Sequence, residues 1–156
     1  MLSFSVSFDQ NKGIGLKGQL PWHLKEDLAL FKKNTLYKNI LMGQTTYVNL
    51  PRKLTNRTIH VVSNDPYYND PEVDIIRDLE AFCRTHEHDE TEYVICGGAS
   101  IYRQAYPYCH KAYISFVKGE HEVDTFFSGF SFENWIIRKE VEYDQFIYRE
   151  LVRKTD

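Results

Sequence analysis

The chain has 156 residues, of which 42% are hydrophobic and 26% are charged, and its formal net charge is −3. These values are ordinary for a globular protein, and the length predicts a single domain over residues 1–156. The basic residues are scattered and no stretch is long and apolar enough to cross a bilayer, so we expect no nucleic-acid or membrane partner. We expect the protein to be a monomer.

The cysteines and the first residues indicate the compartment. Cys83, Cys96 and Cys109 form no CxxC pair, and their odd number and wide spacing argue against a disulfide framework or a zinc site. Residues 1–10 contain neither a basic region nor an apolar run of the kind found in signal peptides. We therefore expect a cytoplasmic protein without a metal.

The first predicted elements are a strand and a glycine loop. Apolar residues alternate with serine over 2–8, which predicts a strand. Residues 13–18, GIGLKG, match G-x-G-x-x-G, but Pro21 follows where the fingerprint needs a helix, and no acidic residue lies about twenty positions on. We reject the dinucleotide fingerprint and interpret these residues as a loop that closes over ligands, with an ordinary surface loop as the alternative.

A helix that carries one acid on its apolar side follows. Leu24, Leu28 and Phe31 recur at the spacing of a core-facing stripe, and Asp27 points the same way. A buried carboxylate needs a partner. Asp27 therefore either bonds a backbone group or a core arginine, or lines a ligand pocket, where burial would raise its pKa.

Two later segments have the order strand, glycine, helix. In the first, a strand over 38–42 precedes Gly43 and a short helix that ends near residue 50. In the second, a strand over 92–96 precedes Gly97-Gly98 and a helix over 99–105. Both junctions suit an anion held at a helix start, and a plain cap or a tight turn is the alternative for each.

The remaining pattern predicts the fold class. Strands and helices alternate up to about residue 117 and strands alone follow, which predicts an α/β fold: an eight-stranded, mostly parallel sheet with an antiparallel C-terminal edge and about four flanking helices. The loop over 51–57 offers arginines that fit a carboxylate, or that are simply solvated. The other predicted strands cover 58–63, 73–76, 111–117, 134–141 and 145–152, and a helix covers 78–86.

From end to end, the chain resembles the dihydrofolate reductase family. The resemblance implies NADPH-dependent reduction of 7,8-dihydrofolate to tetrahydrofolate, with antifolates as inhibitors and a cis bond between the paired glycines. The residues that carry it are Gly15, Leu20-Pro21-Trp22, Asp27-Leu28, Phe31-Lys32, Met42-Gly43 with Thr46, Arg57, Gly97-Gly98 with Ile101-Tyr102, and Asp124-Thr125 with Phe127.

The resemblance also implies roles for single residues. Asp27 would hold the pterin and promote its protonation, Trp22 would hold a water near it, and Tyr102 would lie beside the nicotinamide. The substrate would contact Val6, Asp27, Leu28, Phe31, Leu50, Arg52, Leu54, Arg57, Cys96 and Ser115. The cofactor would contact Ser7, Ile14, Gly15, Gly18, Leu20, Gly43, Gln44, Thr45, Thr46, Val62, Ser63, Asn64, Arg77, Cys96, Gly97, Gly98, Ala99, Ser100, Ile101 and Tyr102.

Several positions depart from the family pattern. Gln44 and Ser100 stand where many members have arginine, and Asp65 would repel a phosphate, which leaves Arg77 as a cation for the 2′-phosphate of NADPH. We still predict NADPH. Cys96 and Ser115 replace the more usual aliphatic residue and threonine, a change expected to alter antifolate affinity and not the reaction.

Two other functions fit the same fold class. One is a reductase of ribosyl-pyrimidines, against which Asp27 after Pro21-Trp22, together with Arg57, argues. The other is a nucleotide-binding or structural protein that has lost catalysis, against which Asp27, the glycine loop and Gly97-Gly98 argue. Turnover of dihydrofolate separates all three.

Overall fold

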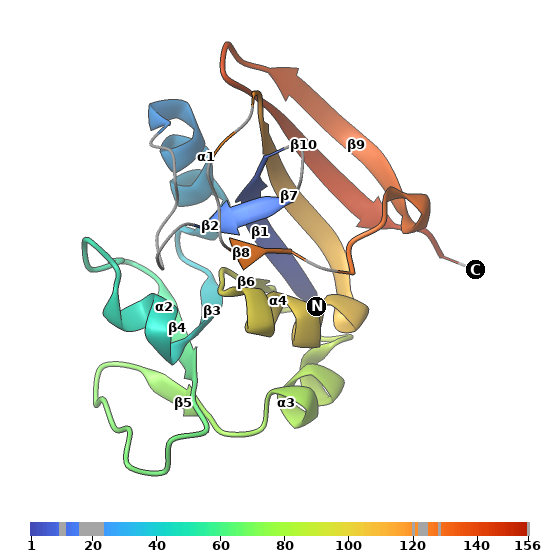
Figure 1. Cartoon of the computed structure of the whole chain (residues 1–156). Coiled ribbons are helices and arrows are strands. Elements are labelled where there is room, and N and C mark those ends of the chain that lie inside the picture. Colours follow the sequence, from blue (N-terminus) through green and yellow to red (C-terminus); the bar gives the residue numbers. More distant parts are fainter. Residues whose placement is uncertain (10–11, 16–23, 120, 122–124, 128, 156) are drawn as a thin grey trace.

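A computed structural model describes residues 1–9, 12–15, 24–119, 121, 125–127 and 129–155. A twisted eight-stranded sheet runs through the molecule, with helices on both sides (Figure 1). The strand order is β5 (Asp74–Ile76), β4 (Thr58–Val62), β3 (Asn39–Gly43), β6 (Tyr93–Ile95), β1 (Leu2–Phe8), β7 (Cys109–Val117), β10 (Phe146–Arg153) and β9 (Trp135–Glu142).

The pairing confirms the predicted fold class. All pairs from β5 to β7 are parallel, whereas β10 is antiparallel to both β7 and β9. Four α-helices connect or flank the strands: α1 (Lys25–Thr35), α2 (Gln44–Val48), α3 (Leu79–His86) and α4 (Ala99–Ala105). No helix in the described part of the chain is long and apolar enough to cross a membrane.

One face of the sheet is covered by α3, α4 and C-terminal aromatic residues. The alternation in β1 places Phe4 and Phe8 on this face, as the sequence predicts. Phe4 lies at the centre, with ring centroids 5.4 Å from Phe127 and 5.7 Å from Trp135. The aromatic cluster around Phe4 therefore forms the centre of the core on this face.

The opposite face carries α1 and α2. Leu24 and Leu30 of the α1 region pack against Tyr113, Phe146 and Tyr148 on β7 and β10. Tyr47 of α2 packs on the cluster formed by β3, β4 and β6. Because the two helices rest on different strands, they flank the region where the carboxyl ends of the central strands emerge.

One short strand lies within the predicted glycine loop. Residues Gly13–Gly15 form β2, which pairs with β8 (Thr125–Phe126) in a separate two-stranded sheet. The interpretation of these three residues as a loop is therefore wrong. Their partner is more than a hundred positions away, so local pattern contained no signal for the pairing. The remainder of the glycine segment lies outside the described residues.

Candidate active site

A cavity of about 860 Å³ opens at the carboxyl ends of the central strands, between α1, α2 and α4. Its wall includes Ser5 and Ser7 near the end of β1, Met42 near the end of β3, and Cys96 after β6. In open α/β sheets, ligands bind at this end of the strands. The position of the cavity therefore suits a ligand site.

Asp27 of α1 faces this cavity. Ser115 Oγ of β7 donates a hydrogen bond to Asp27 Oδ1 across 2.5 Å. Burial raises the pKa of Asp27, and the hydrogen bonds from Ser115 and Ser7 oppose that rise. Two serine hydroxyls and a cavity surround the carboxyl group, which favours the ligand-pocket interpretation of Asp27.

The apolar stripe beside Asp27 also lines the cavity. Leu24 is buried, as predicted, but Leu28 is 44% exposed and Phe31 is half-buried. The prediction of a core-facing stripe is wrong for Leu28. Helical periodicity identifies the inward side of α1, but it does not distinguish a packed core from a hollow, and here the inward side faces the hollow.

Gly97 and Gly98 form the wall opposite α1. Their peptide bond is cis, as the resemblance implied, and Gly97 has φ +135°. A Cβ at Gly98 would lie 3.1 Å from Thr46 Oγ1, and one at Gly97 would lie 3.4 Å from Thr46 Cγ2. Tyr102 Oη donates to the Ser5 carbonyl across 2.7 Å. Because Gly97 and Gly98 have no side chains, their own backbone lies close to Thr46 of α2 and forms part of the cavity wall.

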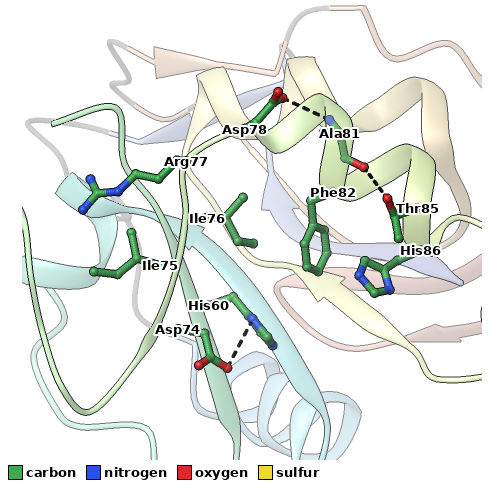
Figure 2. A pocket seen from close by; sticks show the side chains of 10 residues that line it. All are labelled: His60, Asp74, Ile75, Ile76, Arg77, Asp78, Ala81, Phe82, Thr85 and His86. Atoms are coloured by element: carbon green, nitrogen blue, oxygen red, sulfur yellow. Dashed lines mark hydrogen bonds and ion pairs between the residues drawn. The ribbon is translucent and has the colours of Figure 1, made fainter. Parts of the chain in front are cut away.

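Three further polar residues follow the ends of β3, β4 and β5. Ser63 Oγ donates to Gln44 Oε1 across 2.6 Å. The Arg77 guanidinium donates to the carbonyls of Asp65 and Tyr68. Arg77 also borders a separate hollow between β4, β5 and α3, where Asp74 faces His60 and the His60 ring lies beside Phe82 (Figure 2). This hollow lies on the sheet face opposite Asp27.

Arg57 is held at the end of α1. Its Nε donates to Thr35 Oγ1 across 3.0 Å, and its guanidinium lies 6.0 Å from the centre of the Phe31 ring. Burial lowers the pKa of Arg57, and Cys96 opposes the shift. The terminal nitrogens of this guanidinium make no hydrogen bond to any described residue, which suits them to a carboxylate.

The cavity brings together most of the predicted site residues, and others lie elsewhere. Its wall contains Val6, Ser7, Ile14, Asp27, Leu28, Phe31, Thr45, Thr46, Leu50, Arg52, Leu54, Cys96, Gly97, Gly98, Ala99, Tyr102 and Ser115. Residues outside this wall are Gly43, Gln44, Arg57, Val62, Ser63, Asn64, Arg77, Ser100 and Ile101. Gly15 ends β2, and Gly18, Leu20 and Trp22 lie outside the described residues.

Sequence reasoning missed several polar residues that also line the cavity, among them Ser5, Asn34, Asn49, Tyr113 and Tyr148. Asn34 lies seven positions after Asp27, on the same side of α1, and Tyr113 and Tyr148 point from β7 and β10. The helical period from Asp27 could have identified Asn34. Tyr148 could be assigned only after the register of β10 on β7 was known.

Comparison with known proteins identifies the family. The family model for dihydrofolate reductase matches residues 1–150. The chain belongs to the dihydrofolate reductase family. Members of this family reduce dihydrofolate with NADPH, which agrees with a cavity that has the half-buried Asp27 on one wall and the paired glycines on the opposite wall.

Individual members support the assignment. The chain is 33% identical to dihydrofolate reductase of Mycoplasma genitalium, with 85% of this chain and 86% of that protein covered. It is 36% identical to dihydrofolate reductase of Bacillus subtilis, with 86% of this chain and 80% of that protein covered. The fold matches that of dihydrofolate reductase from Enterococcus faecalis, solved with NADP(H) and the compound RAB-propyl, at a TM-score of 0.88 and 28% sequence identity. The match covers 99% of this chain and 97% of that one.

Proposed function

We propose that this protein reduces 7,8-dihydrofolate to 5,6,7,8-tetrahydrofolate with NADPH, and that Asp27 orients the pterin and promotes its protonation. Family membership supports the reaction. The observation that carries the role of Asp27 is its position: a carboxyl group with raised pKa, held by two serine hydroxyls, in the wall of the cavity.

Asp27 is suited to both parts of this role. A carboxylate accepts hydrogen bonds from adjacent N–H groups, so it would fix the amino-pyrimidine edge of a pterin in one orientation. Its raised pKa lets it hold a proton closer to neutral pH than an ordinary aspartate does. Leu28 and Phe31 would pack on the rest of the substrate and keep water from the reacting region.

The substrate also carries a glutamate tail with a carboxylate. Arg57, held by Thr35 just outside the cavity wall, would bind that carboxylate through its terminal nitrogens, and Arg52 lies in the wall itself. The apolar segment between these arginines and Asp27 includes Leu50 and Leu54, which suit the benzoyl ring.

The wall opposite Asp27 fits NADPH, which supplies the hydride when it is bound. Gly97 and Gly98 lie so close to Thr46 that side chains there would fill the space, which suits close approach of a cofactor to backbone. Thr45, Thr46, Ala99 and Tyr102 complete this part of the wall. Gly43, Gln44, Val62, Ser63, Asn64, Arg77, Ser100 and Ile101 would hold the remainder.

We further infer that the protein acts as a cytoplasmic monomer with one domain. One sheet includes strands from Leu2 to Arg153, which supports a single folding unit. Cys83, Cys96 and Cys109 are free thiols, which suits a reducing compartment.

The test is Asp27→Asn, followed as loss of NADPH absorbance with dihydrofolate. We expect the rate at neutral pH to fall by about two to four orders of magnitude, because general acid–base assistance contributes that much. NADPH affinity is expected to stay within about twofold, since Asp27 lies across the cavity from the paired glycines. Glu26→Gln, an exposed change on the same helix, is the control. Near-normal turnover by Asp27→Asn would remove Asp27 from this role.

A further inference from the structure

Two of the polar contacts between helix α1 and the sheet involve side chains of the adjacent strands β7 and β10. Asp27 accepts a hydrogen bond from Ser115 of β7 across 2.5 Å. Asn34 Nδ2 donates to Tyr148 Oη of β10 across 2.9 Å. Leu24 and Leu30 of the α1 region also pack against Tyr113 of β7 and against Phe146 and Tyr148 of β10. The helix that carries the acid therefore contacts β7 and β10 through one side-chain bond to each, in addition to the bond that Asp27 receives from Ser7 of β1.

The two bonds belong to one geometric arrangement. Asp27 and Asn34 are separated by seven residues, which is two helical turns, so they project from the same side about 10 Å apart. Their partners are also related, because Ser115 and Tyr148 are directly opposite each other in the antiparallel pair β7–β10. A shift of α1 along or away from the sheet would change both bonds together.

The second bond is buried and specific. Tyr148 is 2% exposed and Asn34 is 9% exposed, and apolar residues including Leu24 and Phe146 surround the tyrosine. Tyr148 Oη donates onward to Glu150 Oε2 across 2.7 Å, so its proton and a lone pair are both used. Loss of this hydroxyl would leave the Asn34 amide without this partner in a buried place, which destabilises the bonded position of the helix.

We propose that the Asn34–Tyr148 bond is a positioning contact that sets the place of the Asp27 carboxyl group against Ser115. This inference rests on the proposed role of Asp27. Neither Asn34 nor Tyr148 has to touch the pterin for this role, because both act through the position of the helix. Asn34, Tyr148 and Glu150 together make a hydrogen-bonded chain on the α1 side of β10.

The pKa of Asp27 can report a change in the position of α1, because few charged groups lie near its carboxyl group. Among the described residues, the titratable side chains that share the cavity with Asp27 come from four elements or their ends. They are neutral near pH 7, except for Arg52 in the loop after α2. Burial raises the pKa values of the neutral ones. They are Cys96 after β6, Tyr102 of α4, Tyr113 of β7 and Tyr148 of β10, and the carboxyl group of Glu150 lies behind Tyr148.

The hydrogen bond from Ser115 lowers the pKa of Asp27 because it favours the charged carboxylate. If α1 loses its second attachment, this bond lengthens or breaks in part of the population. The pKa of Asp27 then rises further. A residue that only stabilised the fold would lower the melting temperature without moving this pKa.

The test compares Tyr148→Phe and Asn34→Leu with the parent protein. Titration of the ligand-free protein, labelled with 13C at aspartate carboxyl groups and assigned with Asp27→Asn, reports the pKa of Asp27 directly. We expect an upward shift of its midpoint in both variants, and an upward shift of the midpoint in the pH dependence of hydride transfer. The maximal rate of hydride transfer is expected to fall about tenfold, as for a small misplacement of a catalytic group.

Tyr106→Phe is the matched control. It removes a half-buried hydroxyl on the other face of the sheet, which accepts a hydrogen bond from Trp135 Nε1 across 2.8 Å and does not line the cavity. We expect it to lower stability with both midpoints unchanged. Unchanged midpoints in Tyr148→Phe and Asn34→Leu would overturn the inference, as would an equal shift in Tyr106→Phe. Full activity of Asp27→Asn would instead contradict the proposed function, so the two failures are distinguishable.

Discussion

Ser115 and Asp27 connect the central sheet to α1 through a 2.5 Å hydrogen bond, with the hydroxyl as donor. Serine supplies the proton for this bond with a small side chain, and the carboxyl group accepts it inside the cavity wall. The hydroxyl at position 115 therefore controls how readily Asp27 loses its own proton.

Ser115→Ala is expected to raise the pKa of Asp27 above its value in the parent protein. Burial already raises this pKa, and the substitution removes one of the two hydrogen bonds that oppose the rise. The measurement is the 13C titration of the Asp27 carboxyl group. Ser115→Thr keeps the hydroxyl and is expected to titrate like the parent protein. A lower or unchanged pKa in Ser115→Ala would contradict this account.

Thr35→Val is expected to raise KM for dihydrofolate about fivefold to tenfold, with kcat within about twofold, because it affects binding alone. Thr35 Oγ1 accepts from Arg57 Nε and donates to the Phe31 carbonyl across 2.7 Å. Thr85 makes the same kind of bond to the Ala81 carbonyl on α3, so Thr85→Val is a matched control. A fall in kcat without a change in KM would argue against Arg57 as the carboxylate-binding residue.

Gly98→Ala is expected to weaken NADPH binding at least about tenfold and to lower stability by about 1–3 kcal/mol, the usual cost of overpacking. The added Cβ would lie 3.1 Å from Thr46 Oγ1. Binding can be followed by quenching of protein fluorescence. In the background of Thr46→Ala, which removes the crowded oxygen, the same substitution is expected to cost less stability. An equal cost in both backgrounds would exclude this contact as the cause.

His60→Gln tests a pH effect in the second hollow. Burial lowers the pKa of His60, Asp74 opposes the shift and His86 adds to it. The folded state therefore takes up this proton at lower pH than the unfolded state, whose histidine titrates near about 6.5. The lowered pKa of His60 therefore favours the folded state in full above about pH 6.5. This contribution to the free energy of unfolding is lost as the pH falls from about 6.5 through the folded-state pKa.

We expect wild-type stability to fall more than that of His60→Gln between pH 7.5 and 5.5, by at most about 1.4 kcal/mol per pH unit. Glutamine can retain the contact with Asn39, which lies 2.9 Å from His60 Nε2. Urea unfolding at the two pH values gives the comparison. His88→Gln is the control, since that side chain is 83% exposed. Parallel losses in the parent protein and His60→Gln would show that His60 is not responsible.

The sequence predicted most of the fold because its strands and helices have strong periods. Alternation of serine with apolar residues in β1 gave the correct inward side, including Phe4 and Phe8. Leu28 was misjudged because a helix facing a cavity has the same apolar period as one facing a core. The strand β2 was missed because its pairing with β8 depends on distant residues.

The candidate site was predictable in composition and less so in geometry. Asp27 was noticeable as an acid on an apolar stripe, and the family resemblance supplied its partner residues. The bond from Asn34 to Tyr148 depends on the register of β10 on β7, which no local pattern specifies. The involvement of Thr35 with Arg57 depends likewise on how the loop after α2 returns to the end of α1.

The exposed side of Leu28 has a consequence for hydrogen exchange. In the ligand-free protein, 44% of this leucine is open to solvent, and Asp27 and Phe31 border the same hollow. Ligand that fills the hollow covers apolar surface that the polypeptide leaves bare, and it adds free energy of binding to the folded state. Amide protons of α1 will therefore gain more protection on saturation with ligand than those of β7, whose side chains are already buried without it.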